Sequence, residues 1–153
     1  MYRFLSVLVM GTTLLFGYQK GDVVSPEVAQ KIGLTEEKIY VIDFFASWCD
    51  SCKREMPTLS RFSDASSREK IEVIGIDVDQ DPQKAAAFQK EMKEADALTF
   101  RVINDPKGEI IRHFDPVGMP ALYVIRDGKV TAVILGAKDH IDKILHQAVK
   151  EAP

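Results

Sequence analysis

The two cysteines of the chain, Cys49 and Cys52, stand in C-x-x-C spacing and carry its strongest chemical signal. A pair with this spacing is either half of a zinc site or a redox pair. A structural zinc site needs four Cys or His ligands, commonly as two close pairs. The three histidines, His113, His140 and His146, are scattered along the sequence and supply no second pair. The spacing therefore favours thiol–disulfide chemistry, and we expect no metal and no bound cofactor.

The neighbouring sequence predicts a geometry that would activate these thiols. The apolar run 39–45 predicts a buried strand, and Met56, Leu59 and Phe62 at helical spacing predict a helix that begins near Cys49. The unpaired N–H groups and the positive dipole end of that helix would stabilise a thiolate, the form that attacks disulfides. We therefore expect Cys49 to be the nucleophile and Cys52, one turn later, to be the resolving thiol. A purely structural disulfide is disfavoured, because so short a loop removes little unfolded-state entropy.

Two aspartates lie close to the cysteines in the sequence. Asp43 interrupts the predicted buried strand, and burial of its charged form is costly, so we expect a raised pKa. We interpret Asp43 as a general acid/base for Cys52, with a buried aspartate satisfied by backbone groups as an equal alternative. Asp50 lies between the cysteines, where its negative charge would oppose ionisation of Cys49. A less stabilised thiolate favours the reducing direction.

The elements that must position this site alternate between strands and helices. Ser25-Pro26 opens a first helix that Gly33 ends. A second buried strand (71–78), a helix capped by Asp81, a short strand (99–103) and a short helix (109–114) follow the helix of the cysteines. The last third predicts a hairpin, 121–126 and 129–135 around Asp127-Gly128, and a final helix capped by Asp139. This order predicts an α/β fold, a mixed central β-sheet flanked by helices on both faces, with a C-terminal β-hairpin plus helix.

Composition limits the classes of protein that the chain can represent. At 153 residues, with 20 basic and 23 acidic side chains and a net charge of −3, it fits one domain with no basic surface for nucleic acid. Residues 1–19 differ from the rest: Arg3 is followed by the apolar block 4–16, which predicts an export signal or a short membrane anchor. Residues 20–153 then form the folded domain. Export would place it in the periplasm or on the outer face of the cytoplasmic membrane, where disulfides form.

Several motifs in the same order resemble those of thioredoxin-fold proteins, and more narrowly the exported thiol–disulfide oxidoreductases of the TlpA, ResA and CcmG kind. The resemblance covers roughly residues 37–150. It is carried by the strand and motif 41–52 (VIDFFASWCDSC), the following run 53–57 (KREMP), the strand 73–79, and Gly118-Met119-Pro120 before the hairpin.

The resemblance implies a thioredoxin fold and an activity. Such proteins reduce disulfides of exported proteins, in some cases apocytochrome c before haem attachment, and receive electrons from a membrane donor of the DsbD or CcdA type. We therefore expect protein disulfides as substrates of this chain and a role in cytochrome c biogenesis. A disulfide oxidase or isomerase of secreted proteins, and a non-catalytic thioredoxin-fold binding module, remain alternatives.

The resemblance also implies roles for individual residues. Pro120 matches the cis-proline beside the cysteines, so that the backbone of Met119 could pair with an incoming peptide as an added strand. Trp48 is expected to border the active site and contact substrate, with packing at its edge as the alternative. Glu55 matches a glutamate that tunes the thiols, although a solvated helix residue is the alternative. Asp43 matches the buried carboxylate of thioredoxin, where many TlpA-type proteins have Asn.

The lysine that accompanies this carboxylate in thioredoxin has no counterpart here. It falls at Gly75, on the strand beside Asp43. The resemblance thus implies that Asp43 lacks its usual partner.

Overall fold

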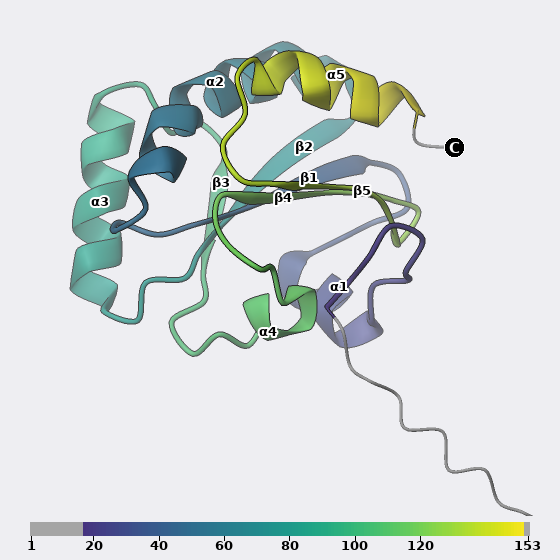
Figure 1. The fold of residues 1–153 in the computed structure, drawn as a ribbon, viewed down its shortest axis with the longest axis horizontal. Helices are drawn as coiled ribbons and strands as arrows, with labels where there is room; N and C mark the ends of the chain where they lie inside the picture. Colours follow the sequence, from purple (N-terminus) through teal and green to yellow (C-terminus); the bar gives the residue numbers. More distant parts are fainter. Residues whose placement is uncertain (1–16, 152–153) are drawn as a thin grey trace, which may run out of the picture.

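The computed structural model describes residues 17–151, in which a five-stranded sheet lies between two layers of helices (Figure 1). The strands are β1 (Ile39–Phe45), β2 (Ile71–Asp77), β3 (Arg101–Asn104), β4 (Ala121–Arg126) and β5 (Lys129–Leu135). The helices are α1 (Pro26–Ile32), α2 (Asp50–Ser66), α3 (Pro82–Glu94), α4 (Ile111–Phe114) and α5 (Ile141–Glu151), and a 3-10 turn, Ser67–Glu69, follows α2.

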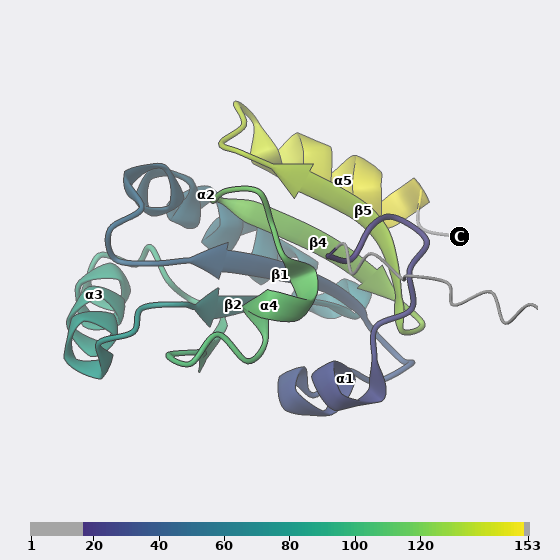
Figure 2. The same ribbon diagram turned by 60° about the horizontal axis from the view of Figure 1, so that its bottom comes forward.

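The strand that leads to the cysteines lies at the centre of the sheet, whose order is β3-β2-β1-β4-β5. β1 runs parallel to β2 and antiparallel to β4, and β4 forms an antiparallel hairpin with β5. Figure 2 shows β5, β4, β1 and β2 side by side in this order. The predicted mixed sheet and C-terminal hairpin are therefore confirmed. β3 pairs with the outer edge of β2 and lies one to two residues later than predicted.

Two apolar cores form because side chains of a strand alternate between the faces of the sheet. Val41 and Phe45 of β1 belong to the core under α2, α3 and α5, whereas Ile42 and Phe44 belong to the core next to α1 and α4. Figure 1 shows α2 and α5 above the sheet and α1 and α4 below it. By this alternation, Asp43 lies on the α2 side.

Most helix ends lie where local sequence signals predict them. The Ser25 hydroxyl accepts a hydrogen bond from the Val28 amide at the start of α1, and Gly33 ends that helix in a left-handed conformation with φ of 80°. The α5 prediction was wrong in one respect. The helix starts at Ile141, and the carbonyl of His140, rather than the side chain of Asp139, lies at the cap position, where it accepts hydrogen bonds from the amides of residues 143 and 144.

The predicted export signal or anchor comprises residues 1–19. Of these, residues 1–16 lie outside the part of the chain that the structure describes. The domain boundary at residue 20 thus stays a prediction. Within residues 17–151, no helix combines the length and the apolar composition that a membrane span requires.

Candidate active site

Cys49 and Cys52 form a disulfide at the start of α2. Cys49 is the N-cap residue, and its Sγ accepts a hydrogen bond from the Cys52 amide at 3.2 Å. The Ser51 hydroxyl lies 3.6 Å from the same sulfur. These are the polar contacts that stabilise a thiolate at a helix N-terminus, as predicted from the motif. Both cysteines are buried, but Cys49 is 6% exposed and Cys52 only 2%, so Cys49 is the sulfur nearer to solvent.

The loop that delivers Cys49 to the helix is held by an aspartate that the sequence analysis missed. Both carboxylate oxygens of buried Asp79 bind Ser47, one accepting from its amide at 2.8 Å and the other from its hydroxyl at 2.9 Å. Asp77, also buried, accepts from the Asp79 amide and from the side chain of Gln89. The sequence feature that could have identified these aspartates is their position at the carboxyl end of a strand that runs parallel to the strand before the cysteines.

Asp43 lies fully buried at the centre of β1. Burial, and secondly the nearby negative charge of Glu55, raises the pKa of Asp43 from 3.8 to about 8. Its Oδ1 accepts no hydrogen bond from any group within residues 17–151. Cys52 approaches the same strand, because its Sγ lies 4.0 Å from the carbonyl oxygen of Phe44, the residue after Asp43. The raised pKa predicted from the sequence is confirmed, whereas the role as acid/base is not tested by the structure.

Aromatic rings occupy the space in which a lysine side chain at position 75 would begin. Asp43 pairs with Gly75 on β2 in the sheet register. A Cβ atom at Gly75 would lie 2.7 Å from the Phe45 ring and 3.0 Å from the Phe100 ring. A side chain at position 75 would require these rings to shift, and the ionisable neighbour of Asp43 comes from α2 instead.

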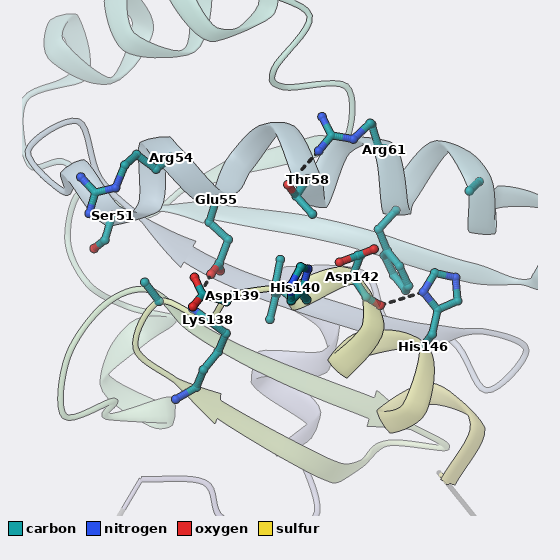
Figure 3. Close-up of a pocket in the computed structure, with 14 residues that line it drawn as sticks. Ser51, Arg54, Glu55, Thr58, Arg61, Lys138, Asp139, His140, Asp142 and His146 are labelled. Carbon is teal, nitrogen blue, oxygen red and sulfur yellow. Dashed lines mark hydrogen bonds between the residues drawn. The ribbon is translucent and has the colours of Figure 1, made fainter.

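That neighbour is Glu55, one turn after Cys52. Its side chain is only 7% exposed, so the alternative of a solvated helix residue is wrong. Figure 3 shows Glu55 pointing away from α2 toward the connection between β5 and α5, where its Oε2 accepts a hydrogen bond from the Lys138 amide at 3.2 Å. Desolvation raises the pKa of Glu55, and the Lys138 amide opposes the rise. Like Asp43, Glu55 has one buried oxygen, Oε1, that no group in the described part of the chain contacts by hydrogen bond.

On the other side of the cysteines, Trp48 and Met119 line one pocket of about 520 Å³. Trp48 is 67% exposed, and its contact with substrate stays a prediction. The Met119–Pro120 peptide bond is cis, as the resemblance implied. Because β4 is antiparallel to β1 and Ala121 pairs with Phe44, Pro120 lies at the same end of the sheet as Cys49. The predicted site residues thus lie around the carboxyl end of β1, within β1 beneath α2 (Asp43), and on α2 itself (Glu55).

Metal binding finds no support in the side chains that the structure describes. No three His, Cys, Asp or Glu side chains within residues 17–151 gather as metal ligands. His140 and His146 are exposed, as predicted. His113 was also expected at the surface, but it is half-buried and its Nε2 is enclosed without a hydrogen-bond partner among residues 17–151.

The layered mixed sheet and the C-x-x-C disulfide at the start of a helix define a protein with the thioredoxin fold. Residues 26–133 match the model of the AhpC/TSA family, and the chain belongs to this family. Two curated relatives are thiol-disulfide oxidoreductases. The chain is 25% identical to sporulation thiol-disulfide oxidoreductase A of Bacillus subtilis over 97 residues, and 29% identical to ResA of Bacillus thuringiensis over 107 residues. These matches cover 63% and 68% of this chain, but only 58% and 60% of the respective relatives.

Solved structures agree with the fold. A candidate thiol:disulfide interchange protein DsbE from Chlorobium tepidum is 24% identical, with a TM-score of 0.73 and coverage of 88% of this chain and 97% of that one. StoA from Bacillus subtilis is 22% identical, with a TM-score of 0.64 over 75% of this chain and 84% of StoA. At these identities the similarity supports the thioredoxin fold, and the chemistry must be argued from the residues of the site.

Proposed function

We propose that this protein is a thiol–disulfide oxidoreductase that reduces disulfides of exported proteins. The observation that carries the proposal is the Cys49–Cys52 disulfide at the N-terminus of α2, with Cys49 nearer to solvent. The pocket beside it, lined by Trp48 and Met119, offers an apolar surface for a substrate polypeptide. The backbone of Met119, ahead of Pro120, is the proposed partner for an extended peptide segment.

The proposed reaction starts from the dithiol form. The Cys49 thiolate attacks one sulfur of the substrate disulfide, forming a mixed disulfide and releasing the first substrate thiolate. Cys52 then gives its proton to the carboxylate of Asp43 and attacks the Cys49 sulfur. This step forms the Cys49–Cys52 disulfide and releases the second substrate thiolate. Two electrons pass from the protein to the substrate, and a dithiol donor must return two electrons to reduce Cys49–Cys52 again.

The direction of electron flow rests on charge at the start of α2. Asp50 is the first residue of the helix, next to Cys49, and its carboxylate opposes the negative charge of a thiolate there. A thiolate that is stabilised less leaves the disulfide form more favourable, which makes the pair a better reductant.

The proposal also covers the cellular location of the protein and its partners. Residues 1–19 would carry the protein across the membrane or anchor it there, so that it acts in the periplasm or on the outer face of the cytoplasmic membrane. Its electrons would then come from a membrane dithiol protein of the DsbD or CcdA type. Apocytochrome c is the substrate class that the resemblance implies. Cell fractionation of the full chain tests the location: recovery in the cytoplasm would contradict it.

Two serine variants test the chemistry. Cys52→Ser is expected to accumulate a covalent adduct between Cys49 and a substrate protein, because the attack is retained and the resolving thiol is lost. Cys49→Ser should form no adduct and reduce no disulfide. Mass spectrometry of non-reduced samples measures the adduct. Equal reduction of a protein disulfide by wild type and Cys49→Ser would exclude the enzyme and favour a binding module.

A further inference from the structure

The pocket beside the disulfide has one wall that neither the cysteine motif nor the cis-proline supplies. This wall comes from the connection between β3 and α4, of which Pro106, Lys107 and Gly108 line the pocket. The remaining wall is mostly apolar and is formed by Trp48, Val78, Ile111, Pro116 and Met119. Among the described residues that line the pocket, Lys107 alone carries a charge. The pocket thus combines an apolar interior with one cation in its wall.

The β3–α4 connection is held rigidly, so that Lys107 is presented from a fixed backbone. The carboxylate of buried Asp105 accepts hydrogen bonds from the amides of residues 110 and 111, at 3.0 and 2.9 Å. The Gly108 amide closes the turn on the Asp105 carbonyl at 3.0 Å, and Gly108 adopts a left-handed φ of 64°. The Asp105 amide in turn donates to the carbonyl of the last residue of β2 at 2.7 Å. These bonds tie the turn that carries Lys107 to the sheet.

The charge of Lys107 is not neutralised by the described part of the chain. Lys107 is exposed, and its ammonium group forms no ion pair or hydrogen bond with any residue in the range 17–151. The acidic residues on either side of it in the sequence are bound elsewhere, Asp105 by backbone amides and Glu109 by Lys31 at 2.6 Å. A cation of this kind attracts a carboxylate of a bound partner and repels a second cation.

Sheet geometry sets how far this cation lies from the cysteines. Cys49 follows β1 and Lys107 follows β3, and both strands run parallel to β2, which lies between them. Neighbouring strands are about 4.8 Å apart, so β1 and β3 are separated by roughly 10 Å. An extended peptide advances about 3.3 Å per residue, so a carboxylate that reaches Lys107 belongs to a residue within about three positions of the substrate cysteine.

We propose that Lys107 is a specificity residue, and that the pocket takes a polypeptide disulfide whose cysteine has a bulky apolar neighbour and an acidic residue within about three positions. This inference rests on the proposed function, because the segment is bound for attack by Cys49 on its disulfide. The apolar side chain of the substrate packs against Trp48 and Met119, and its carboxylate pairs with Lys107. Lys107 touches no reacting atom, so it selects the substrate and takes no part in the thiol chemistry.

Symmetric disulfides of short peptides test this preference. Each peptide has a central cysteine, with leucine or serine on one side and glutamate, glutamine or lysine on the other, and both orders are made. The reduced full-length protein is mixed with excess peptide, and the released thiol is measured by chromatography to give a second-order rate constant. We expect leucine to exceed serine by about tenfold through apolar burial. We expect glutamate to exceed lysine by about two- to fivefold through one exposed ion pair.

The same comparison in charge variants assigns the preference to one side chain. Lys107→Glu should reverse it, so that the lysine peptide reacts faster than the glutamate peptide. Lys129→Glu is the matched control: it changes the net charge equally at an exposed position beside the hairpin turn, and it should keep the wild-type preference. A preference that Lys107→Glu leaves unchanged, or that Lys129→Glu reverses equally, would overturn the proposal.

Salt separates the two parts of the recognition without any substitution. At about 1 M salt the glutamate preference should disappear and the leucine preference should remain, because salt screens exposed charges but does not weaken apolar burial. A charge preference that survives this salt would contradict the exposed ion pair. Equal rates for all peptides would overturn the specificity alone. Failure of the underlying function would look different, because no peptide would then be reduced in a reaction that Cys49→Ser abolishes.

Discussion

At the scale of single residues, the site contains a buried carboxyl group, and burial makes the charged form of this group unfavourable. Asp43 lies wholly inside the α2-side core, and the rings of Phe45 and Phe100 occupy the space where a lysine would be needed to neutralise it. Burial raises the pKa of this carboxyl to about 8, so that both its protonated and its ionised forms are accessible near neutral pH. In the proposed reaction, the protonated form of Asp43 would protonate a leaving Cys52 thiolate, and the ionised form would accept the thiol proton.

This burial predicts a stability that falls as pH rises. Between the unfolded pKa of 3.8 and the folded pKa of about 8, only the folded state keeps the proton on Asp43, so stability falls by about 1.4 kcal/mol per pH unit through this group. The contribution is complete below pH 3.8 and lost above about pH 8. Asp43→Asn removes this slope, and the variant should exceed wild type in stability increasingly from pH 5 to pH 8. Urea unfolding at several pH values measures the difference, and parallel curves would contradict it.

Gly75 should tolerate no side chain. In Gly75→Ala the new Cβ would overlap the rings of Phe45 and Phe100, and we expect a loss of about 1–3 kcal/mol in the free energy of unfolding. Gly118→Ala is the matched control, because no atom lies within 4 Å of a Cβ added there. Thermal and urea unfolding of the two variants provide the comparison. Similar stabilities would mean that the rings move aside.

At the scale of elements, the active-site loop is fixed between two parallel strands. The chain leaves β1 and reaches Cys49 through Ser47, which Asp79 holds from the end of β2. Asp79 is in turn bound through its amide to Asp77. The position of the disulfide thus depends on a hydrogen-bonded link from the neighbouring strand.

Asp79→Ala should loosen this link. It removes both acceptors of Ser47, and the loss of hydrogen bonds to a buried charged group predicts a destabilisation of about 1–3 kcal/mol. Ser47→Ala and the double variant complete a cycle that isolates the coupling between the two residues. Additive effects on the free energy of unfolding would show that the loop is held by other contacts.

The sequence was sufficient to predict most helices and strands, but not the contacts between them. Continuous apolar runs identified β1 and β2, and Asp127-Gly128 identified the hairpin, because those signals are local. The start of α5 was misplaced because the backbone of His140, with φ of 57°, forms the cap instead of a side chain. Burial of Glu55 could not be anticipated, since it depends on Lys138, which lies 83 positions away in the sequence.

At the scale of the whole molecule, the sheet topology brings four separate segments to one end. β1 and β2 are parallel, so the segments after them, which carry Cys49 and Asp79, leave the sheet together. β4 is antiparallel to β1, so its beginning, with Met119 and Pro120, lies at this same end. The start of α5 approaches from above and closes the groove that contains Glu55 (Figures 1 and 3). The cysteine pair, the pocket lined by Trp48 and Met119, and the buried side chain of Glu55 thereby come together at one end of the sheet.

The most direct test of the account is a redox titration of the purified protein in glutathione or dithiothreitol buffers. The single tryptophan, Trp48, precedes Cys49 and reports the state of the disulfide by its fluorescence. We predict one reversible two-electron transition with a midpoint near or below about −250 mV, in the range of thioredoxin. A midpoint above about −150 mV, toward the oxidising range of DsbA, would contradict the reductase and make the protein a disulfide donor. The absence of any reversible transition would contradict thiol–disulfide exchange altogether.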